Sequence, residues 1–324
     1  MKALALLSGG LDSALAVKLI KEQGIDVVAL NFVSPFCLCN QKGRCTAIDV
    51  AKNLKVPLTI VDKGQEYLRL IRNPKYGYGK NLNPCIDCRI FILKKAKKYA
   101  KKIGAKFIFT GEVLDERPMS QHKKALDLIE REAGLKGKLL RPLSAKLLPE
   151  TEAEKKGFVD RNKLMALHGR SRKPQFELVK KFKIRGHACP GGGCLLTYKE
   201  FADKVRDLFR YKKRITAKDI QLLKAGRHFR QNKNKIIVGR NEEDNKQLLN
   251  LKGKTDLMFE AKNVMGPITL LQGKANKKAI ELAASLTARY SDAETDRVLV
   301  KYGKEKFNKE VAVNKIKEVE GLRI

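Results

Sequence analysis

Short apolar runs alternate with stretches of helical periodicity through the first third of the chain. The apolar runs predict β-strands over residues 2–7, 26–32, 57–61 and 106–110. Apolar residues that recur every three or four positions predict helices over residues 12–23, 45–54, 65–72 and 86–103. Strands and helices that alternate in this way form βαβ units, whose parallel sheet is covered by helices on both faces. Residues 1–135 are therefore predicted to form an α/β domain.

The pattern changes after residue 135. The stretch "KLLRPLSAKLLPE" is extended and interrupted by prolines, and two helices are predicted on either side of residues 169–174. A glycine-rich turn, "CPGGGC", precedes a helix predicted over residues 199–211. Residues 136–212 are assigned to a helical and extended continuation of the first domain.

The last region has the pattern of a small α+β domain. Apolar and polar residues alternate in "GRHFRQNKNKIIVG" around an "NKN" turn, which predicts a β-hairpin. A helix ending at Leu251 follows, then strands within "TDLMFEAK" and "GPITLLQG", a helix over residues 276–290, and the closing stretch "RVLVKYGKEKFNKEVAV". Residues 213–324 are therefore predicted to be a separate domain.

The charge of the chain narrows the class of partner. Lysine and arginine total 69 residues against 35 aspartates and glutamates, a formal net charge of +34. A surface of ion pairs would need acids in matching number, so the excess indicates a polyanion, nucleic acid. Aromatic residues are only 6% and tryptophan is absent, which argues against recognition mainly by base stacking. No apolar run approaches the ~18 residues of a membrane span, and a cytoplasmic protein with no membrane partner is expected.

The segment "SGGLDS" separates the first strand from the first helix. Gly9 and Gly10 let the backbone approach an anion without a Cβ in the way. The helix N-terminus adds unpaired N–H donors and a partial positive charge. The hydroxyls of Ser8 and Ser13 can bond phosphate oxygens, and Asp12 or Ser13 can cap the helix. The segment is neither a Walker loop nor G-x-G-x-x-G, and we interpret it as a phosphate site rather than an ordinary turn.

Clustered cysteines indicate metal or redox chemistry more than structural disulfides. Cys85 and Cys88 form a C-x-x-C at the start of a helix, whose N-terminus lowers the pKa of a thiol. Cys189 and Cys194 follow about a hundred residues later. Two helix-start thiols and one distant cysteine can supply three ligands to an iron–sulfur cluster. The same residues can instead form a persulfide donor and its resolving thiol.

Three further cysteines, Cys37, Cys39 and Cys45, follow the second predicted strand in "SPFCLCNQKGRC". Three thiols fit a second metal site that lacks one ligand. They can also serve sulfur delivery, or have no chemical role. The sequence leaves these three interpretations open.

Several motifs together resemble the PP-loop tRNA thiolation enzymes, relatives of tRNA 2-thiouridylase and 4-thiouridine synthetase. They are "SGGLDS", "NPKYGYGKNLNPCIDCRI", "TGEVLDERPMSQ", "LLRPLSAKLLPET", "GRSRKPQ" and "CPGGGCLLT", and they cover roughly residues 1–210. The resemblance implies a parallel sheet of the adenine nucleotide alpha-hydrolase type. The segment "GRHFRQ…KIIVGRNEEDN" resembles the RNA-binding domain of NFACT ribosome-quality-control proteins. Two departures concern local contacts: Asp115-Glu116 stands where Gly-Gln is expected, and Gly191 where Ala is expected.

The resemblance implies ATP-dependent thiolation of a tRNA uridine. ATP and Mg²⁺ would be held by Ser8, Gly9, Gly10, Asp12 and Ser13. A uridine carbonyl oxygen would be adenylated with release of pyrophosphate, and a sulfur nucleophile would then displace AMP. Adenylation is needed because a carbonyl oxygen is a poor leaving group, and the loop stabilises charge on the phosphates. The implied product is 4-thiouridine at tRNA position 8, with 2-thiouridine at another position as the alternative.

For the sulfur step we favour a [4Fe–4S] cluster on Cys85, Cys88 and Cys194, so that Asp12 and these cysteines are the catalytic residues. A persulfide on Cys194, resolved by Cys88 or Cys85, is the rival mechanism. The sulfur would come from sulfide or from a cysteine desulfurase or sulfur carrier. Glu112, at the end of the fourth strand, can face the nucleotide pocket.

Three basic segments are candidate contacts to tRNA phosphates. Their residues are Arg170, Arg172, Lys173, Lys212, Lys213, Arg214, Arg227 and Arg230. Recognition of folded tRNA by shape and backbone needs few aromatic residues. Two other classes remain open: an RNA-binding assembly factor with a vestigial PP-loop, and a PP-loop ligase that amidates or adds lysine. A homodimer is one arrangement that the sequence allows.

Overall fold

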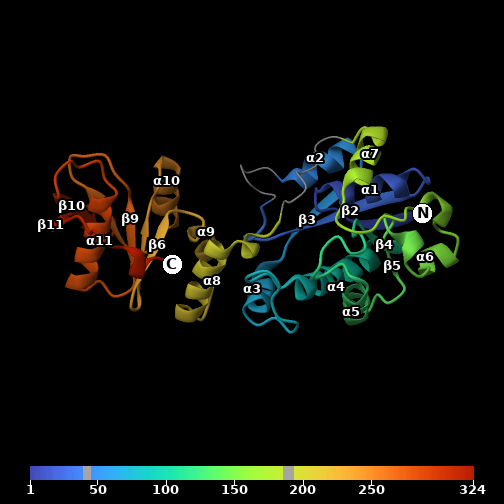
Figure 1. The fold of residues 1–324 in the computed structure, drawn as a ribbon, viewed down its shortest axis with the longest axis horizontal. Helices are drawn as coiled ribbons and strands as arrows, with labels where there is room; N and C mark the ends of the chain where they lie inside the picture. The colour runs from blue at the N-terminus through green and yellow to red at the C-terminus, as the bar shows by residue number, and fades with distance from the viewer. Residues whose placement is uncertain (39–44, 185–192) are drawn as a thin grey trace. The chain divides into compact units, whose positions relative to one another are not determined.

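The computed structural model describes residues 1–38, 45–184 and 193–324. The chain divides into two compact units, Met1–Thr197 and Tyr198–Ile324, each considered by itself below (Figure 1). The segment expected as a continuation, residues 136–212, is thus divided between the units. Of "CPGGGC", Gly193 and Cys194 belong to the described ranges. None of the helices in these ranges combines the length and apolar composition that a membrane crossing requires.

A five-stranded parallel sheet forms the centre of the first unit, in the order β3-β2-β1-β4-β5. Its strands are β1 (Lys2–Leu6), β2 (Asp26–Val33), β3 (Leu58–Asp62), β4 (Phe107–Thr110) and β5 (Leu139–Leu140). The four expected strands are confirmed, and β5 was missed because two residues are too few for a pattern. Since all five strands are parallel, the loops that follow them meet at one edge of the sheet.

Helices cover both faces of this sheet (Figure 1). They are α1 (Leu11–Lys21), α2 (Thr46–Asn53), α3 (Gly64–Arg72), α4 (Cys85–Ile103), α5 (Lys123–Ala133), α6 (Glu152–Lys155) and α7 (Lys173–Phe182). Successive residues of a strand point to opposite faces. Ala3 and Ala5 therefore pack with α1, α2 and α7, whereas Leu4 packs with Leu93 of α4 and Ile129 of α5. The expected α/β fold with helices on both faces is confirmed.

The structure differs from the expected helices at two places in this unit. One helix, α5, was missed, although its apolar residues have helical spacing and the His122 side chain caps it. The helix expected before residue 169 is wrong, because only the short 3-10 turn Arg161–Lys163 forms there. The backbone of Met165 and Leu167 instead bonds to Pro142 and Leu143, at 2.9 and 2.7 Å. Those bonds hold the segment extended.

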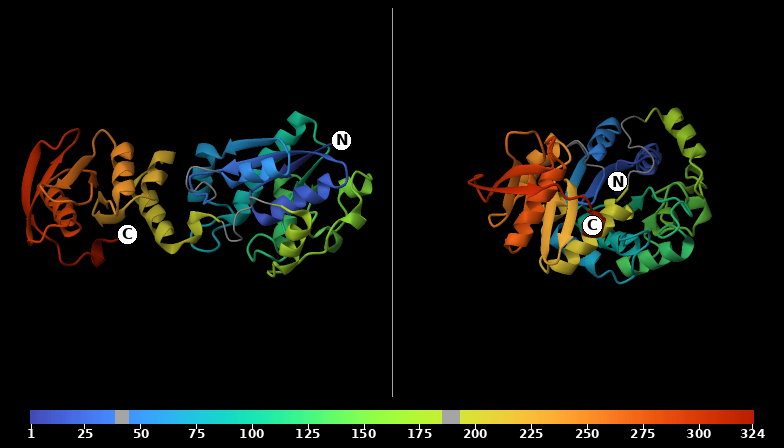
Figure 2. Two further views of the ribbon diagram at one scale, coloured as in Figure 1. Left: turned by 90° about the horizontal axis from the view of Figure 1, so that it is seen from above. Right: turned by 60° about the vertical axis from the view of Figure 1, so that its left-hand side comes forward.

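The second unit is a six-stranded antiparallel sheet, in the order β11-β10-β8-β9-β7-β6 (Figure 2). Its elements are α8 (Lys199–Tyr211), α9 (Ala217–Leu222), β6 (Arg227–Gln231), β7 (Asn234–Val238), α10 (Glu242–Leu251), β8 (Leu257–Ala261), β9 (Thr269–Gln272), α11 (Lys277–Arg289), β10 (Arg297–Gly303) and β11 (Lys309–Asn314). One face packs on α11, and the other packs on α9 and α10. The expected α+β domain and its hairpin are confirmed, with Asn232 at the turn in the left-handed conformation (φ +53°).

Candidate functional site

The loop after β1 is tightly enclosed by two neighbouring segments. Gly9 has a φ of +80°, and a Cβ there would lie 2.6 Å from the backbone nitrogen of Ala47 in α2. A Cβ on Gly111, just after β4, would lie 2.4 Å from the backbone nitrogen of Ser13. Within the loop, the Ser13 hydroxyl donates to the Gly10 carbonyl at 2.9 Å. Both glycines are therefore required for the close approach of these backbones.

The first turn of α1 is arranged to receive an anion. The N-cap residue is Gly10, and no side chain in the described part of the chain caps the helix. The expectation that Asp12 or Ser13 provides the cap is wrong, since both already belong to the helix. The first backbone N–H groups are thus left for a ligand. Among the described residues, Asp12 Oδ1 and Thr46 Oγ1 beside the loop are buried without a hydrogen-bond partner.

Two side chains outside the loop set its electrostatic environment. Burial and, after it, the negative charge of Glu116 raise the pKa of Asp12 to about 6, and Arg172 and Arg117 oppose this increase in part. Glu116 is buried and pairs with Arg172. Arg172, which was expected at the RNA, thus has a carboxylate partner next to the PP-loop. The neighbouring Asp115 has a φ of +60°, a conformation that suits the glycine expected there.

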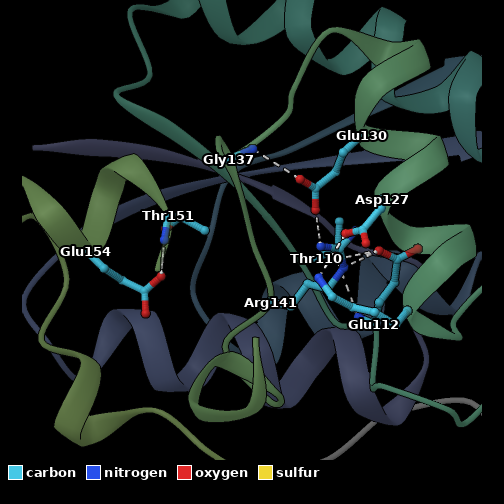
Figure 3. A network of polar contacts seen from close by, with 9 residues as sticks. Thr110, Glu112, Asp127, Glu130, Gly137, Arg141, Thr151 and Glu154 are labelled. Atoms are coloured by element: carbon cyan, nitrogen blue, oxygen red, sulfur yellow. Dashed lines mark hydrogen bonds and ion pairs between the residues drawn. The ribbon is translucent and has the colours of Figure 1, made fainter. Parts of the chain in front are cut away.

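Glu112 belongs to a buried network of ion pairs (Figure 3). Its Oε2 accepts from Arg141 Nε at 3.1 Å and from Thr110 Oγ1 at 3.1 Å, and its Oε1 lies 3.4 Å from Arg89 Nε. Arg141 also pairs with Glu130 on α5. Burial alone would raise the pKa of Glu112, but the two guanidinium groups outweigh it and hold that pKa below its usual range. The network joins β4, α4 and α5, which assigns Glu112 a structural role.

The C-x-x-C cysteines begin α4, and Cys88 has two unexpected donors. Cys85 is the first helical residue, and the Cys88 amide donates to the carbonyl of the N-cap proline at 2.8 Å. Cys88 Sγ accepts hydrogen bonds from Tyr67 Oη at 3.1 Å and from Lys63 Nζ at 3.3 Å. Lys63 is only 8% exposed and Tyr67 2%. The sequence analysis missed both, although Lys63 directly follows β3 at the edge where the other loops meet.

Cys194 lies opposite Cys37. The two residues form an isolated antiparallel bridge. The amide after Cys37 donates to the carbonyl before Cys194 at 3.2 Å, and the amide after Cys194 donates to the carbonyl before Cys37 at 2.9 Å. Burial, with smaller contributions from the charges of Cys88 and Cys37, raises the pKa of Cys194 to about 12. The segment with "CPGGGC" is therefore anchored to the loop that follows β2.

Three thiols share the surroundings of Tyr67. Burial raises the pKa of the Tyr67 hydroxyl, and Cys88, Cys194 and Cys37 raise it further through their charge. Burial also raises the pKa of Cys85, although Arg89 opposes this, so the expected lowering by the helix start does not prevail there. Across residues 1–38, 45–184 and 193–324, no three Cys, His, Asp or Glu side chains are arranged to hold a metal ion.

The other cysteines of the second-strand loop have separate positions. Cys45 is buried at the N-cap of α2, and its Sγ lies 3.9 Å from Asn31 Oδ1. It is thus apart from Cys37 and its bridge to Cys194. Cys39 and Cys189 fall outside the described residues, as does Gly191.

The basic candidates for RNA contact differ in how they are held. The exposed ones are Arg170, Lys173, Lys212, Lys213 and Arg214. Lys212 pairs with Asp219 at 2.6 Å. Arg230 makes two hydrogen bonds to Asp207, at 2.8 and 2.5 Å, and stacks 4.1 Å over the Tyr211 ring. The Arg227 guanidinium lies 4.5 Å from the centre of the Tyr290 ring, at the C-cap of α11. The exposed residues are therefore better placed to meet phosphates than Arg227 and Arg230.

Two known domain families match this chain. Residues 1–132 match the tRNA methyl transferase HUP domain. Residues 226–321 match the NFACT protein RNA binding domain. The chain thus resembles a HUP domain over its first 132 residues and an NFACT-type RNA-binding domain over residues 226–321. These matches confirm the resemblance to PP-loop tRNA thiolation enzymes with an NFACT-type domain that the motifs indicated.

The HUP domain is similar to tRNA-specific 2-thiouridylases named MnmA. It is 34% identical over 130 residues to MnmA of Petrotoga mobilis, covering 35% of each chain. It is 30% identical over 125 residues to MnmA of Leptospira interrogans, covering 34% of this chain and 33% of that protein. The chain thus spans about a third of the length of the curated relatives it matches.

Distant similarity extends to solved structures. One is a 4-thiouridine synthetase–RNA complex with bound ATP, 21% identical, covering 68% of this chain and 52% of that one, with a TM-score of 0.38. Another is the U34-tRNA thiolase NcsA from Methanococcus maripaludis with its [4Fe–4S] cluster, 18% identical, covering 65% and 67%, with a TM-score of 0.36.

Proposed function

We propose that this protein uses ATP to replace a uridine carbonyl oxygen of tRNA with sulfur. The observation that carries the proposal is that the nucleotide loop and the thiols lie at one sheet edge. The PP-loop follows β1, Cys37 follows β2 and Lys63 follows β3. Arg117 links the two sites, since its charge lowers the pKa of both Asp12 and Cys85. An adenylated uridine held at the PP-loop would therefore be near the sulfur.

The first step is adenylation. The open N–H groups of α1 and the hydroxyls of Ser8 and Ser13 would bind the ATP phosphates, and ionised Asp12 would hold Mg²⁺. Arg117 and Arg172 would offset the negative charge that develops as pyrophosphate leaves. The close packing of Gly9 and Gly111 fixes the loop, so these donors need little reorganisation.

The second step is sulfur transfer. The described residues Cys85, Cys88 and Cys194 are not already arranged as three metal ligands, but their donor chemistry fits an iron–sulfur cluster. They are part-buried thiols from two segments, and Cys88 interacts electrostatically with both others. These three would hold a [4Fe–4S] cluster, which when bound supplies an iron site for sulfide. A persulfide on Cys194 is the alternative route to the same product. In both, Lys63 and Tyr67 would orient Cys88 by donating hydrogen bonds to its sulfur.

The substrate is proposed to be tRNA, with 4-thiouridine at position 8 as the product. The NFACT-type domain and the formal charge of +34 support an RNA substrate. The alternative product is 2-thiouridine, since the similar MnmA enzymes are named tRNA-specific 2-thiouridylases. Sulfide, or a cysteine desulfurase with a sulfur carrier, would supply the sulfur.

The test is thiolation in vitro. Protein purified without oxygen is incubated with unmodified tRNA, ATP, Mg²⁺ and sulfide, and the nucleosides are analysed by mass spectrometry. We expect 4-thiouridine, loss of product in Cys194→Ala, and ATP binding by that variant equal to wild type. Absence of any thionucleoside from active-site-intact protein would instead favour the RNA-binding factor or another adenylating ligase.

A further inference from the structure

The pairing of Cys37 with Cys194 has the geometry of a disulfide site. The flanking backbone hydrogen bonds, at 3.2 and 2.9 Å, come from the residues on either side, so the two cysteines are a pair without hydrogen bonds between them. Opposite residues of that kind have Cα atoms about 4.5 Å apart. That spacing lies within the range that a disulfide spans. The backbone therefore already places the two residues where an S–S bond can form.

We propose that Cys37 is the thiol that resolves sulfur transfer from Cys194, closing a Cys37–Cys194 disulfide in each turnover. The inference deepens the proposed function and rests on its persulfide route, in which Cys194 carries the sulfur instead of holding a cluster. The two cysteines of the C-x-x-C are held differently. Cys88 Sγ accepts hydrogen bonds from the Tyr67 hydroxyl and from Lys63 after β3, and the charges that act on Cys85 are those of Arg89, Cys88 and Arg117.

Ser34 holds the Cys37 side chain beside Cys194. Ser34 Oγ lies 3.3 Å from Cys37 Sγ, so the hydroxyl and the thiol can share a hydrogen bond. The Tyr67 hydroxyl interacts electrostatically with Cys37, Cys88 and Cys194. All of these groups are part-buried or buried. Sulfur exchange at this place would occur with water largely excluded.

The step balances with a persulfide donor and a dithiol reductant as co-reactants. The terminal sulfur of a Cys194 persulfide attacks the adenylated uridine carbon, and AMP leaves with the former carbonyl oxygen. The Cys37 thiolate then attacks Cys194 Sγ and breaks its bond to the sulfur now on uridine. That sulfur keeps the electron pair and becomes the thiocarbonyl, while the two cysteines are oxidised to a disulfide. An external dithiol reduces the disulfide, and a persulfide donor reloads Cys194.

The test is a single turnover with persulfide-loaded protein, followed by tryptic mapping without reduction. Wild type is expected to give one Cys37–Cys194 disulfide for each thiouridine formed. Cys37→Ser is expected to stop after the sulfur attack and to retain tRNA covalently on Cys194. Adding a dithiol should then release thiouridine from that adduct.

Matched controls assign the disulfide. Cys39→Ser and Cys189→Ser each remove the second cysteine of the same tryptic peptide, and both should keep the link. A disulfide from Cys194 to Cys85 or Cys88, or thiouridine formed without any disulfide, would overturn the assignment. If persulfide-loaded wild type forms no thiouridine but the protein thiolates tRNA with sulfide, the persulfide route is overturned and the proposed function stands. If neither sulfur source gives thiouridine, the proposed function fails, and oxidation with diamide then decides the pairing. After diamide oxidation the peptide linked through Cys37 and Cys194 is still expected, and its absence would overturn the pairing of these two cysteines.

Discussion

Lys63 is a buried lysine whose ammonium group contacts the Cys88 sulfur and an aromatic face. Its Nζ lies 3.3 Å from Cys88 Sγ and 4.3 Å from the centre of the Tyr67 ring. Hydrogen bonds from a charged donor are strong, so the ammonium group and the Tyr67 hydroxyl hold the Cys88 sulfur in one orientation. Because Lys63 is only 8% exposed, solvent screens this attraction little. Lys63 is therefore a positioning residue for the sulfur step.

Replacing Lys63 with methionine should slow thiolation without changing ATP binding. A hydrogen bond to a charged group contributes about 1.5–3 kcal/mol, which corresponds to a loss of roughly 10- to 100-fold in rate. Alkylation of Cys88 by iodoacetamide should slow in parallel, and Lys63→Arg should recover part of both. Lys94→Met, an exposed change on α4, is the control. Equal alkylation rates in Lys63→Met and wild type would contradict this role.

The pKa of Asp12, about 6, gives nucleotide binding a pH dependence. Mg²⁺ binds the ionised carboxylate, so the affinity for Mg²⁺–ATP should fall as pH drops below about 6, at most about tenfold per pH unit. The raised pKa also means that the free energy of unfolding contributed by this group falls as pH rises through 6. Calorimetric measurement of the ATP affinity at several pH values between 5 and 8 gives the midpoint pH of this dependence.

Glu116→Gln provides the internal check on that midpoint. It removes the charge that raises the pKa of Asp12 and leaves Arg172 without its carboxylate partner. Both effects lower the pKa of Asp12, so the midpoint should move to lower pH. A midpoint that stays in place would show that another group governs the titration.

At the scale of elements, the strands and helices of the first domain could be predicted, because their patterns are local. The boundaries of β1 to β4 and α1 to α4 lie within two residues of the expected ranges. The glycine loop could be recognised because strand, loop and helix are contiguous. The helix expected before residue 169 failed because backbone bonds to Pro142 and Leu143, remote in sequence, hold that segment extended. Tertiary context decides such segments.

The Glu112–Arg141 ion pair connects the segments after β4 and β5, a contact that the sequence pattern does not predict. Both side chains are 3% exposed or less, and breaking a buried pair costs about 3–5 kcal/mol. Arg141→Met should therefore lower the free energy of unfolding in urea by that amount, whereas Lys123→Met, at an exposed pair, should cost less than about 1 kcal/mol. The lowered pKa of Glu112 stabilises the fold above the unfolded pKa of about 4.3, and this contribution is lost as pH falls.

A second variant keeps that expectation testable. Glu112→Gln combined with Arg141→Met removes the charge that Arg141→Met alone leaves on Glu112, and should recover part of the lost stability. Equal stability of the single and double variants would contradict a coupled pair.

At the scale of the whole molecule, the excess of basic residues should make tRNA binding strongly dependent on salt. Each phosphate contact that is lost reduces the slope of log affinity against log salt by about 1. Arg214→Ala, at an exposed residue, should show this reduction. Arg230→Met should change the slope less, because its guanidinium is already bonded to Asp207. Filter binding at several salt concentrations measures both, and equal changes would place Arg230 at the RNA.

The arrangement of the thiols is a property of the whole first unit and could not be predicted from the sequence. The C-x-x-C was evident because its spacing is local. Cys37 and Lys63 follow different strands, and only the strand order brings their loops together with Cys194. The sequence therefore indicated the chemistry of the site, whereas the fold decides which side chains share it.

The measurement that tests the central claim most directly follows the uridine oxygen. Unmodified tRNA is prepared with ¹⁸O at uridine C4 and incubated with the protein, ATP, Mg²⁺ and a sulfur source, and the released AMP is weighed by mass spectrometry. Adenylation of the carbonyl oxygen requires that AMP gain one ¹⁸O for each 4-thiouridine formed. Label at C2 tests 2-thiouridine in the same way. AMP that carries no ¹⁸O from either position would contradict uridine activation by this protein.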